Sequence, residues 1–148
     1  MRTLILRLTF TCLLGAVAIV PAAQAANDPP TVRGPDLTSV RAEIAAKKYD
    51  AALAELKVLV VNYPNPDVYS LLGHALWKTG DWRQGMTYYD KALAIDPSHK
   101  GALEYQGELY VELGQLDLAK QNLAKLNHLC WFGCDEARDL KAAIEHAP

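Results

Sequence analysis

A repeat with a period of 34 residues is the feature that most constrains how this chain can fold. Gly73 and Gly107 are separated by this interval, and so are Gly80 and Gly114. After residue 35, apolar residues recur at helical spacing, and no useful stretch alternates with the period of two that a strand requires. Such a period is typical of stacked helical hairpins, because one hairpin alone cannot bury its apolar face. The sequence therefore predicts an all-α fold, an α-α superhelix of about three hairpins plus a C-terminal capping helix.

Turn and cap residues fall where these hairpins need them. Gly80 and its counterpart 34 residues later follow the first helix of a hairpin, where a left-handed residue closes a helix at least steric cost. Asn65 and Pro66 supply a cap and a preset first residue for the helix that begins at 66. Asp81 can cap the next helix, with Gln84 reaching back. The helix boundaries around residues 65 and 80 can therefore be predicted from local chemistry.

Residues 66–99 resemble a tetratricopeptide repeat. The matching residues are Tyr69, Leu72, Gly73, Leu76, Gly80, Trp82, Gly85, Tyr89, Ala92, Leu93 and Pro97. A second repeat over residues 100–133 matches at Gly107, Tyr110, Gly114, Leu116, Ala119 and Leu123, with Trp131 where the closing proline would stand. A weaker repeat from about 33 to 65 matches in its second helix, at Tyr49, Ala52, Leu56 and Pro64. The resemblance implies close helix packing at the small residues, with the large aromatic residues filling the gaps between hairpins.

The first 25 of the 148 residues have the features of a secretory signal peptide. Arg2 and Arg7 precede an apolar run from Leu8 to Val20, and small residues at 23 and 25 mark a cleavage site. An uncleaved N-terminal anchor is the alternative. We expect a flexible leader at 26–35 and one tetratricopeptide repeat domain at 36–148. That domain would contain repeats at about 33–65, 66–99 and 100–133 and a capping helix at 135–146. Cleavage predicts a periplasmic or secreted protein without a membrane span.

Charge argues against nucleic acid as a partner. Removal of Arg2 and Arg7 would leave 13 of the 15 basic residues against 17 acidic ones, so the net charge of −2 would become −4. No basic patch of the kind that binds phosphate backbones remains. Motifs of enzymes are also missing: there is no phosphate-binding loop, no G-x-S-x-G and no H-E-x-x-H. We therefore expect a protein that is not an enzyme and needs no cofactor.

The resemblance implies a concave groove lined by the first helix of each hairpin. The residues that it places there are Ser70, His74, Trp77, Glu104, Glu108 and Glu112. The three glutamates share one helical stripe, which is either an ordinary solvated face or an acidic wall that selects a basic peptide segment. Trp77 could equally pack in the core. The basic residues with which some family members clamp a peptide's carboxyl terminus are missing at these positions.

Cys130 and Cys134 lie in the segment "LNHLCWFGCDEARDL", which resembles the end of small exported bacterial repeat proteins. In an unbroken helix their Cβ atoms would be about 5–6 Å apart, too far for a disulfide, but Gly133 offers a break in the helix. In an oxidising compartment we expect a local disulfide. A redox pair is one alternative, although the spacing differs from the thioredoxin type. Another is a metal site in which His128 joins the two cysteines.

The sequence predicts a non-enzymatic adaptor or assembly factor in the cell envelope, with a protein or basic peptide segment in its groove. Two other functions stay open. One is a metal or redox accessory protein that uses Cys130 and Cys134, and the other is a structural module that assembles with copies of itself.

Overall fold

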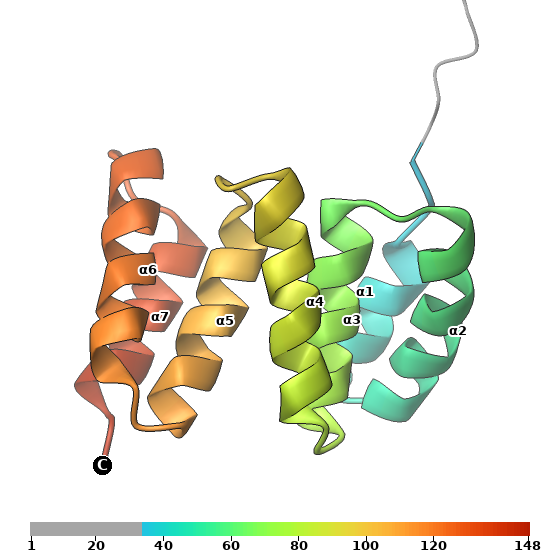
Figure 1. Ribbon diagram of the computed structural model, residues 1–148, viewed down its shortest axis with the longest axis horizontal. Helices are drawn as coiled ribbons and strands as arrows, with labels where there is room; N and C mark the ends of the chain where they lie inside the picture. Colours follow the sequence, from blue (N-terminus) through green and yellow to red (C-terminus); the bar gives the residue numbers. More distant parts are fainter. Residues whose placement is uncertain (1–33) are drawn as a thin grey trace, which may run out of the picture. The chain divides into compact units, whose positions relative to one another are not determined.

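The computed structural model describes residues 34–148, so the expected signal peptide at 1–25 and most of the leader lie outside the described part. Over residues 34–148 the chain forms seven helices and no strand (Figure 1). The helices are α1 (Thr38–Ala45), α2 (Tyr49–Asn62), α3 (Pro66–Lys78), α4 (Trp82–Ile95), α5 (Lys100–Glu112), α6 (Leu116–Leu129) and α7 (Asp135–Glu145). None of these seven helices combines the length and the apolar character that crossing a bilayer requires.

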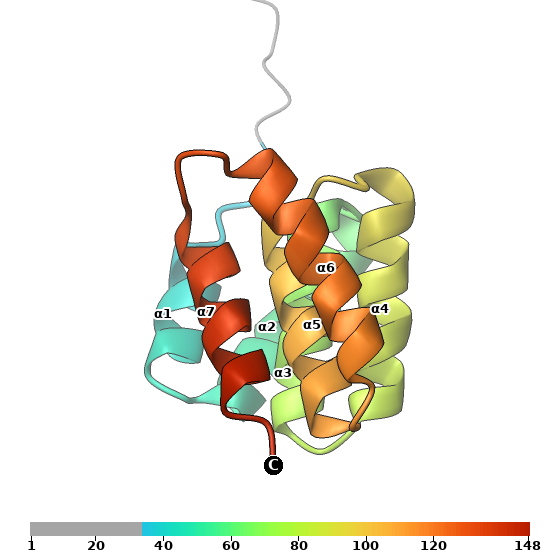
Figure 2. The ribbon, with the colours of Figure 1, turned by 90° about the vertical axis from the view of Figure 1, so that its left-hand side faces the viewer.

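The helices of the described part form three antiparallel hairpins, α1–α2, α3–α4 and α5–α6, followed by the single helix α7. Each helix packs on its neighbour in sequence, and α3 also packs on α5, which in turn packs on α7. Figure 2 shows α1 and α7 on one side of the stack and α4 and α6 on the other. The prediction of an all-α superhelix of three hairpins with a C-terminal helix is thus confirmed.

The helix ends follow from the predicted caps. The Asn65 side chain accepts a hydrogen bond from the Val68 backbone N–H at 3.1 Å, and Asp81 caps α4 through the Gln84 N–H at 3.1 Å. The Gln84 side chain donates to the Asp81 carboxylate at 2.6 Å, whereas a capping box would use the backbone N–H of the cap residue. Gly80 has a φ of 101°, a left-handed conformation that closes α3 without the penalty a Cβ atom would bring.

Small residues allow α3 and α4 to pack backbone against backbone. A Cβ atom built on Gly73 would lie 2.9 Å from the carbonyl oxygen of Gly85, and one built on Gly85 would lie 2.8 Å from that of Gly73. The ring of Tyr89 is fully buried directly beside Gly73. The glycines at two repeat positions are therefore required by the tight crossing of the two helices.

The last hairpin ends in a sharp corner. Helix α6 stops at Leu129, Gly133 adopts a φ of 89°, and a disulfide joins Cys130 to Cys134 with their Cα atoms 5.6 Å apart. That separation lies within the usual disulfide range. Helix α7 then packs its fully buried Leu140 against Gly107 of α5. The corner between the cysteines carries Trp131 and Phe132 into solvent, where they are 81% and 86% exposed.

Candidate functional site

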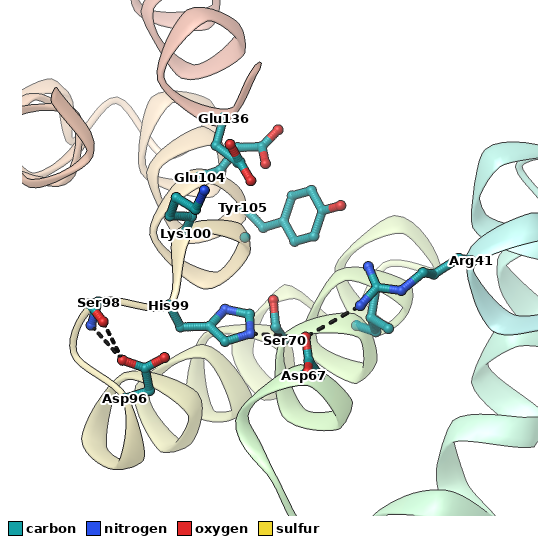
Figure 3. A pocket seen from close by; sticks show the side chains of 12 residues that line it. Arg41, Asp67, Ser70, Asp96, Ser98, His99, Lys100, Glu104, Tyr105 and Glu136 are labelled. Atoms are coloured by element: carbon teal, nitrogen blue, oxygen red, sulfur yellow. Dashed lines mark hydrogen bonds and ion pairs between the residues drawn. The ribbon is translucent and has the colours of Figure 1, made fainter. Parts of the chain in front are cut away.

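A pocket of about 430 Å³ opens between the inner helices α1, α3, α5 and α7 (Figure 3). These are the first helices of the three hairpins together with the capping helix, so the pocket lies on the surface where the groove is expected. The turn between α4 and α5 forms one edge of it. The residues that line it are Arg41, Asp67, Ser70, Leu71, Asp96, Ser98, His99, Lys100, Gly101, Glu104, Tyr105 and Glu136.

One end of the pocket is closed by paired charges. The Asp67 carboxylate is 3.3 Å from the Arg41 guanidinium and 3.3 Å from Nε2 of His99. The other ring nitrogen of His99, Nδ1, accepts a hydrogen bond from the Ala102 backbone N–H at 3.0 Å and so caps α5. Because Nδ1 is an acceptor, the neutral ring carries its proton on Nε2. The Nε2–H group donates a hydrogen bond to the Asp67 carboxylate. Both nitrogens of His99 are therefore committed to structural hydrogen bonds.

The other end is acidic. Glu104 from α5 and Glu136 from α7 both line the pocket, and Figure 3 draws them at this end of it. Burial, and to a lesser degree the nearby carboxylates of Glu108, Asp139, Glu136 and Asp135, together raise the pKa of Glu104 to about 8. Burial also raises the pKa of Glu108, while the positive charge of Lys78 opposes that rise. This end of the pocket thus brings several acids close to Glu104.

The predicted groove residues occupy three different environments. Ser70 and Glu104 line the pocket, as expected for a groove. His74 and Trp77 are buried beneath it, and the His74 ring lies 4.1 Å from the Tyr105 ring between centroids. Burial lowers the pKa of His74 to about 4, so this imidazole is neutral near pH 7. His74 and Trp77 therefore pack in the interior, and other side chains form the surface of the pocket that a ligand can reach.

The stripe of glutamates is also divided. The Trp77 indole N–H donates a hydrogen bond of 2.7 Å to the Glu112 carboxylate, which joins α3 to α5. Glu108 is half-buried and faces the charge of Lys78. Glu104, in contrast, has neither a hydrogen bond nor an ion pair among residues 34–148. Of the three predicted acids, Glu104 is therefore the one available to a ligand in the pocket.

The sequence reasoning missed most of the pocket lining. The predicted groove does not include Arg41, Asp67 or Glu136, because their helices are far apart along the chain and come to one pocket only in the folded stack. The sequence does contain a signal for Tyr105, the aromatic residue of the pocket. It follows Leu71 by the repeat interval of 34 residues, and both residues line the pocket. The position of Glu136 had no such signal, since α7 lies outside the repeated segment.

The cysteine corner brings together a different cluster from the one that the alternative metal site would use. One ligand atom each from Cys130, Cys134 and Glu136 lies within 4.8 Å of the others, and His128 does not belong to this group. His128 instead lines a separate apolar pocket with Pro97 and neighbouring residues of α6. Because the two sulfurs are joined in a disulfide, they are not available as thiolate ligands.

Comparison with models of protein families matches residues 66–99 to the tetratricopeptide repeat. These are the residues of α3, α4 and the turn that leads to α5. A comparison with curated proteins finds no significant match.

Proposed function

Because residues 66–99 match the tetratricopeptide repeat and a pocket lies between α1, α3, α5 and α7, we propose that the chain is a non-enzymatic adaptor or assembly factor of the cell envelope. It would hold a segment of a partner protein in the concave groove. Tetratricopeptide repeats serve in protein–protein interaction, and stacked repeats build extended concave binding surfaces. The observation that carries the proposal is the pocket between α1, α3, α5 and α7, with carboxylates at one end that have no partner within the described chain.

The chemistry of the pocket supports binding over catalysis. A hydrolytic site needs a nucleophile within hydrogen-bond reach of a base. Ser70 has no hydrogen-bond partner among residues 34–148, and His99 uses both ring nitrogens for α5 and Asp67. The side chains that line the pocket are therefore suited to orient a ligand, and none of them forms a nucleophile–base pair.

Two features support a location outside the cytoplasm. The first is the predicted signal peptide at residues 1–25. The second is the disulfide between Cys130 and Cys134, since such bonds persist mainly in oxidising compartments. A partner would then be another protein of the cell envelope or a secreted one.

Site-specific crosslinking in intact cells tests this function. A photoreactive residue replaces Lys100, which is exposed at the mouth of the pocket, or Lys120, which is exposed on the outer helix α6. A lysine is replaced at both positions, so the two variants differ only in the surface on which the photoreactive residue lies. We expect a discrete crosslinked partner from position 100 that position 120 does not give.

The crosslinks are compared in the envelope and cytoplasmic fractions. Equal capture from positions 100 and 120, or no capture from position 100, would contradict the groove as the binding surface. Recovery of the full-length chain with residues 1–25 attached, in the cytoplasm, would contradict the envelope location.

A further inference from the structure

A buried hydroxyl faces the pocket without a hydrogen-bond partner. Ser70 is only 2% exposed, and its Oγ makes no hydrogen bond to any atom of residues 34–148. Figure 3 shows this oxygen pointing into the pocket, toward the side on which Tyr105 lies. A buried hydroxyl without a partner destabilises the folded protein, because it has lost its hydrogen bonds to water. A ligand that brings an N–H group to this position would therefore gain a hydrogen bond at a site already shielded from water.

Two acids from different helices line the other end of the same pocket. Glu104 projects from α5 and Glu136 from the first turn of α7. Among residues 34–148 neither of them makes a hydrogen bond or an ion pair. Lys100 also lines the pocket, one helical turn before Glu104, yet it forms no ion pair with either acid. Within the described chain, no basic side chain therefore forms an ion pair with either acid.

The surroundings favour an organic cation over a metal ion. Metal ions need three or more ligand atoms close together, and in residues 34–148 the only such group that includes Glu136 involves the two bridged cysteines. The half-buried ring of Tyr105 lines the pocket beside Glu104, and an aromatic face attracts ammonium and guanidinium groups. The neutral imidazole of His74 packs behind that ring and adds no repelling charge.

We propose that the pocket receives a lysine or arginine side chain of the partner segment, with its cationic group between Glu104 and Glu136. The aliphatic part of that side chain lies along Tyr105, and an N–H group of the same segment donates to Ser70 Oγ. This inference rests on the proposed adaptor function and adds the chemistry of the residue that the groove selects. Arg41 stays paired with Asp67 at the opposite end, so it does not compete for the acids.

The test uses the full chain with its disulfide intact and a capped pentapeptide, Gly-Gly-Lys-Gly-Gly, followed by nuclear magnetic resonance. A twin peptide with acetylated lysine keeps the length of the side chain and removes its charge. We expect the lysine peptide to shift the amide signals of Gly101, Glu104 and Glu136, and the twin to leave them in place. Binding should weaken as salt is raised, because the contact is between charges.

The matched variants are the double substitution Glu104→Gln with Glu136→Gln, and the control Glu145→Gln at the exposed end of α7. The double variant should bind the lysine peptide at least about tenfold more weakly, since hydrogen bonds to charged groups are stronger than those between neutral groups. The control should bind as the parent does. Equal binding by the double variant, or equal shifts with the acetylated twin, would overturn the proposal.

Two further outcomes separate this proposal from its premise. If butylamine binds as tightly as the pentapeptide, the ligand is a free amine and the partner segment is the wrong source. If the photoreactive residue at position 100 captures a partner and the double variant captures it equally well, the cation pocket is wrong while the adaptor function stands. If position 100 captures nothing, the adaptor function itself fails.

Discussion

Replacing Glu104 by glutamine should stabilise the protein at alkaline pH and leave its stability near pH 4 unchanged. Burial first, then the charges of Glu108 and Asp139, raise the pKa of Glu104 from 4.5 to about 8 in the folded protein. Between these two values the folded chain keeps a proton that the unfolded chain has released. Stability is therefore lost as the pH rises through this window, because the folded state binds more protons. Glutamine has the same shape and cannot ionise, so it removes this loss.

The size of the effect follows from the shift in the pKa of Glu104. A change from 4.5 to about 8 corresponds to about 4.8 kcal/mol at 1.36 kcal/mol per unit. Glu104 is only half-buried, and water and salt screen its interaction with the other acids. We therefore expect about 2 kcal/mol in the free energy of unfolding at pH 9. For a domain of this size, that difference raises the melting temperature by about 8 °C.

Thermal unfolding followed by circular dichroism at several pH values between 4 and 9 measures this difference. Glu145→Gln provides the control, since this acid is exposed at the end of α7 and lies outside the pocket. The control and the parent should show the same dependence on pH. A gain from Glu104→Gln that is equal at pH 4 and pH 9 would refute the electrostatic reasoning, and so would a loss at pH 9.

Three further variants test the packing, each measured by urea denaturation. Serine at both Cys130 and Cys134 should lower the free energy of unfolding by about 2 kcal/mol, because the bridge closes a loop of five residues; an unchanged value would mean that the bridge does not form. Gly73→Ala should cost about 1–3 kcal/mol, since its Cβ atom would stand 2.7 Å from the Tyr89 ring; a gain would refute the close approach of α3 and α4. Tyr89→Phe should leave stability unchanged or raise it by about 1 kcal/mol, because the buried hydroxyl has no partner within residues 34–148; a clear loss would reveal one.

The sequence predicted the fold well because the signals for it are local and periodic. The cap at Asn65, the left-handed Gly80 and the repeat interval each act within one hairpin, and each appears in the structure as expected. Gly133 likewise identified the break between α6 and α7. Features of this kind do not depend on which distant helices a hairpin meets, so composition and spacing are enough to find them.

The pocket could be predicted only in part, because burial depends on neighbours that one helix does not encode. Helix α3 packs against α2, α4 and α5, and as a result every residue from 70 to 77 is buried. The sequence assigned His74 and Trp77 to the same face as Ser70, yet only Ser70 reaches the pocket. Arg41 and Glu136 come from opposite ends of the repeat stack, and no pattern within either segment relates them.

The disulfide corner connects the end of the repeat stack to the chemistry of the pocket. Glu136 is the second residue of α7, two positions after Cys134, so the bridge holds the start of the helix that carries this acid. The positive end of the α7 dipole stabilises the negative charge of Glu136. Glu104 has no such support, and burial together with its acidic neighbours raises its pKa to about 8. The disulfide corner therefore positions one acid of the pocket, while burial acts on the other.

A lysine side chain between these acids should displace the proton of Glu104, so binding and proton release are coupled. The acids that face Glu104 are Glu108 on its own helix and Asp135, Glu136 and Asp139 on α7, while the cation Arg41 is held by Asp67. The affinity for the lysine pentapeptide should rise by up to about fifty-fold between pH 6 and pH 8, because with a pKa of about 8 the ionised fraction of Glu104 in the free protein rises from about 1% to about 50%. Titrations at the two pH values measure this rise. In the Glu104→Gln variant the affinity should be lower and independent of pH, and the same rise in that variant would assign the proton to another group.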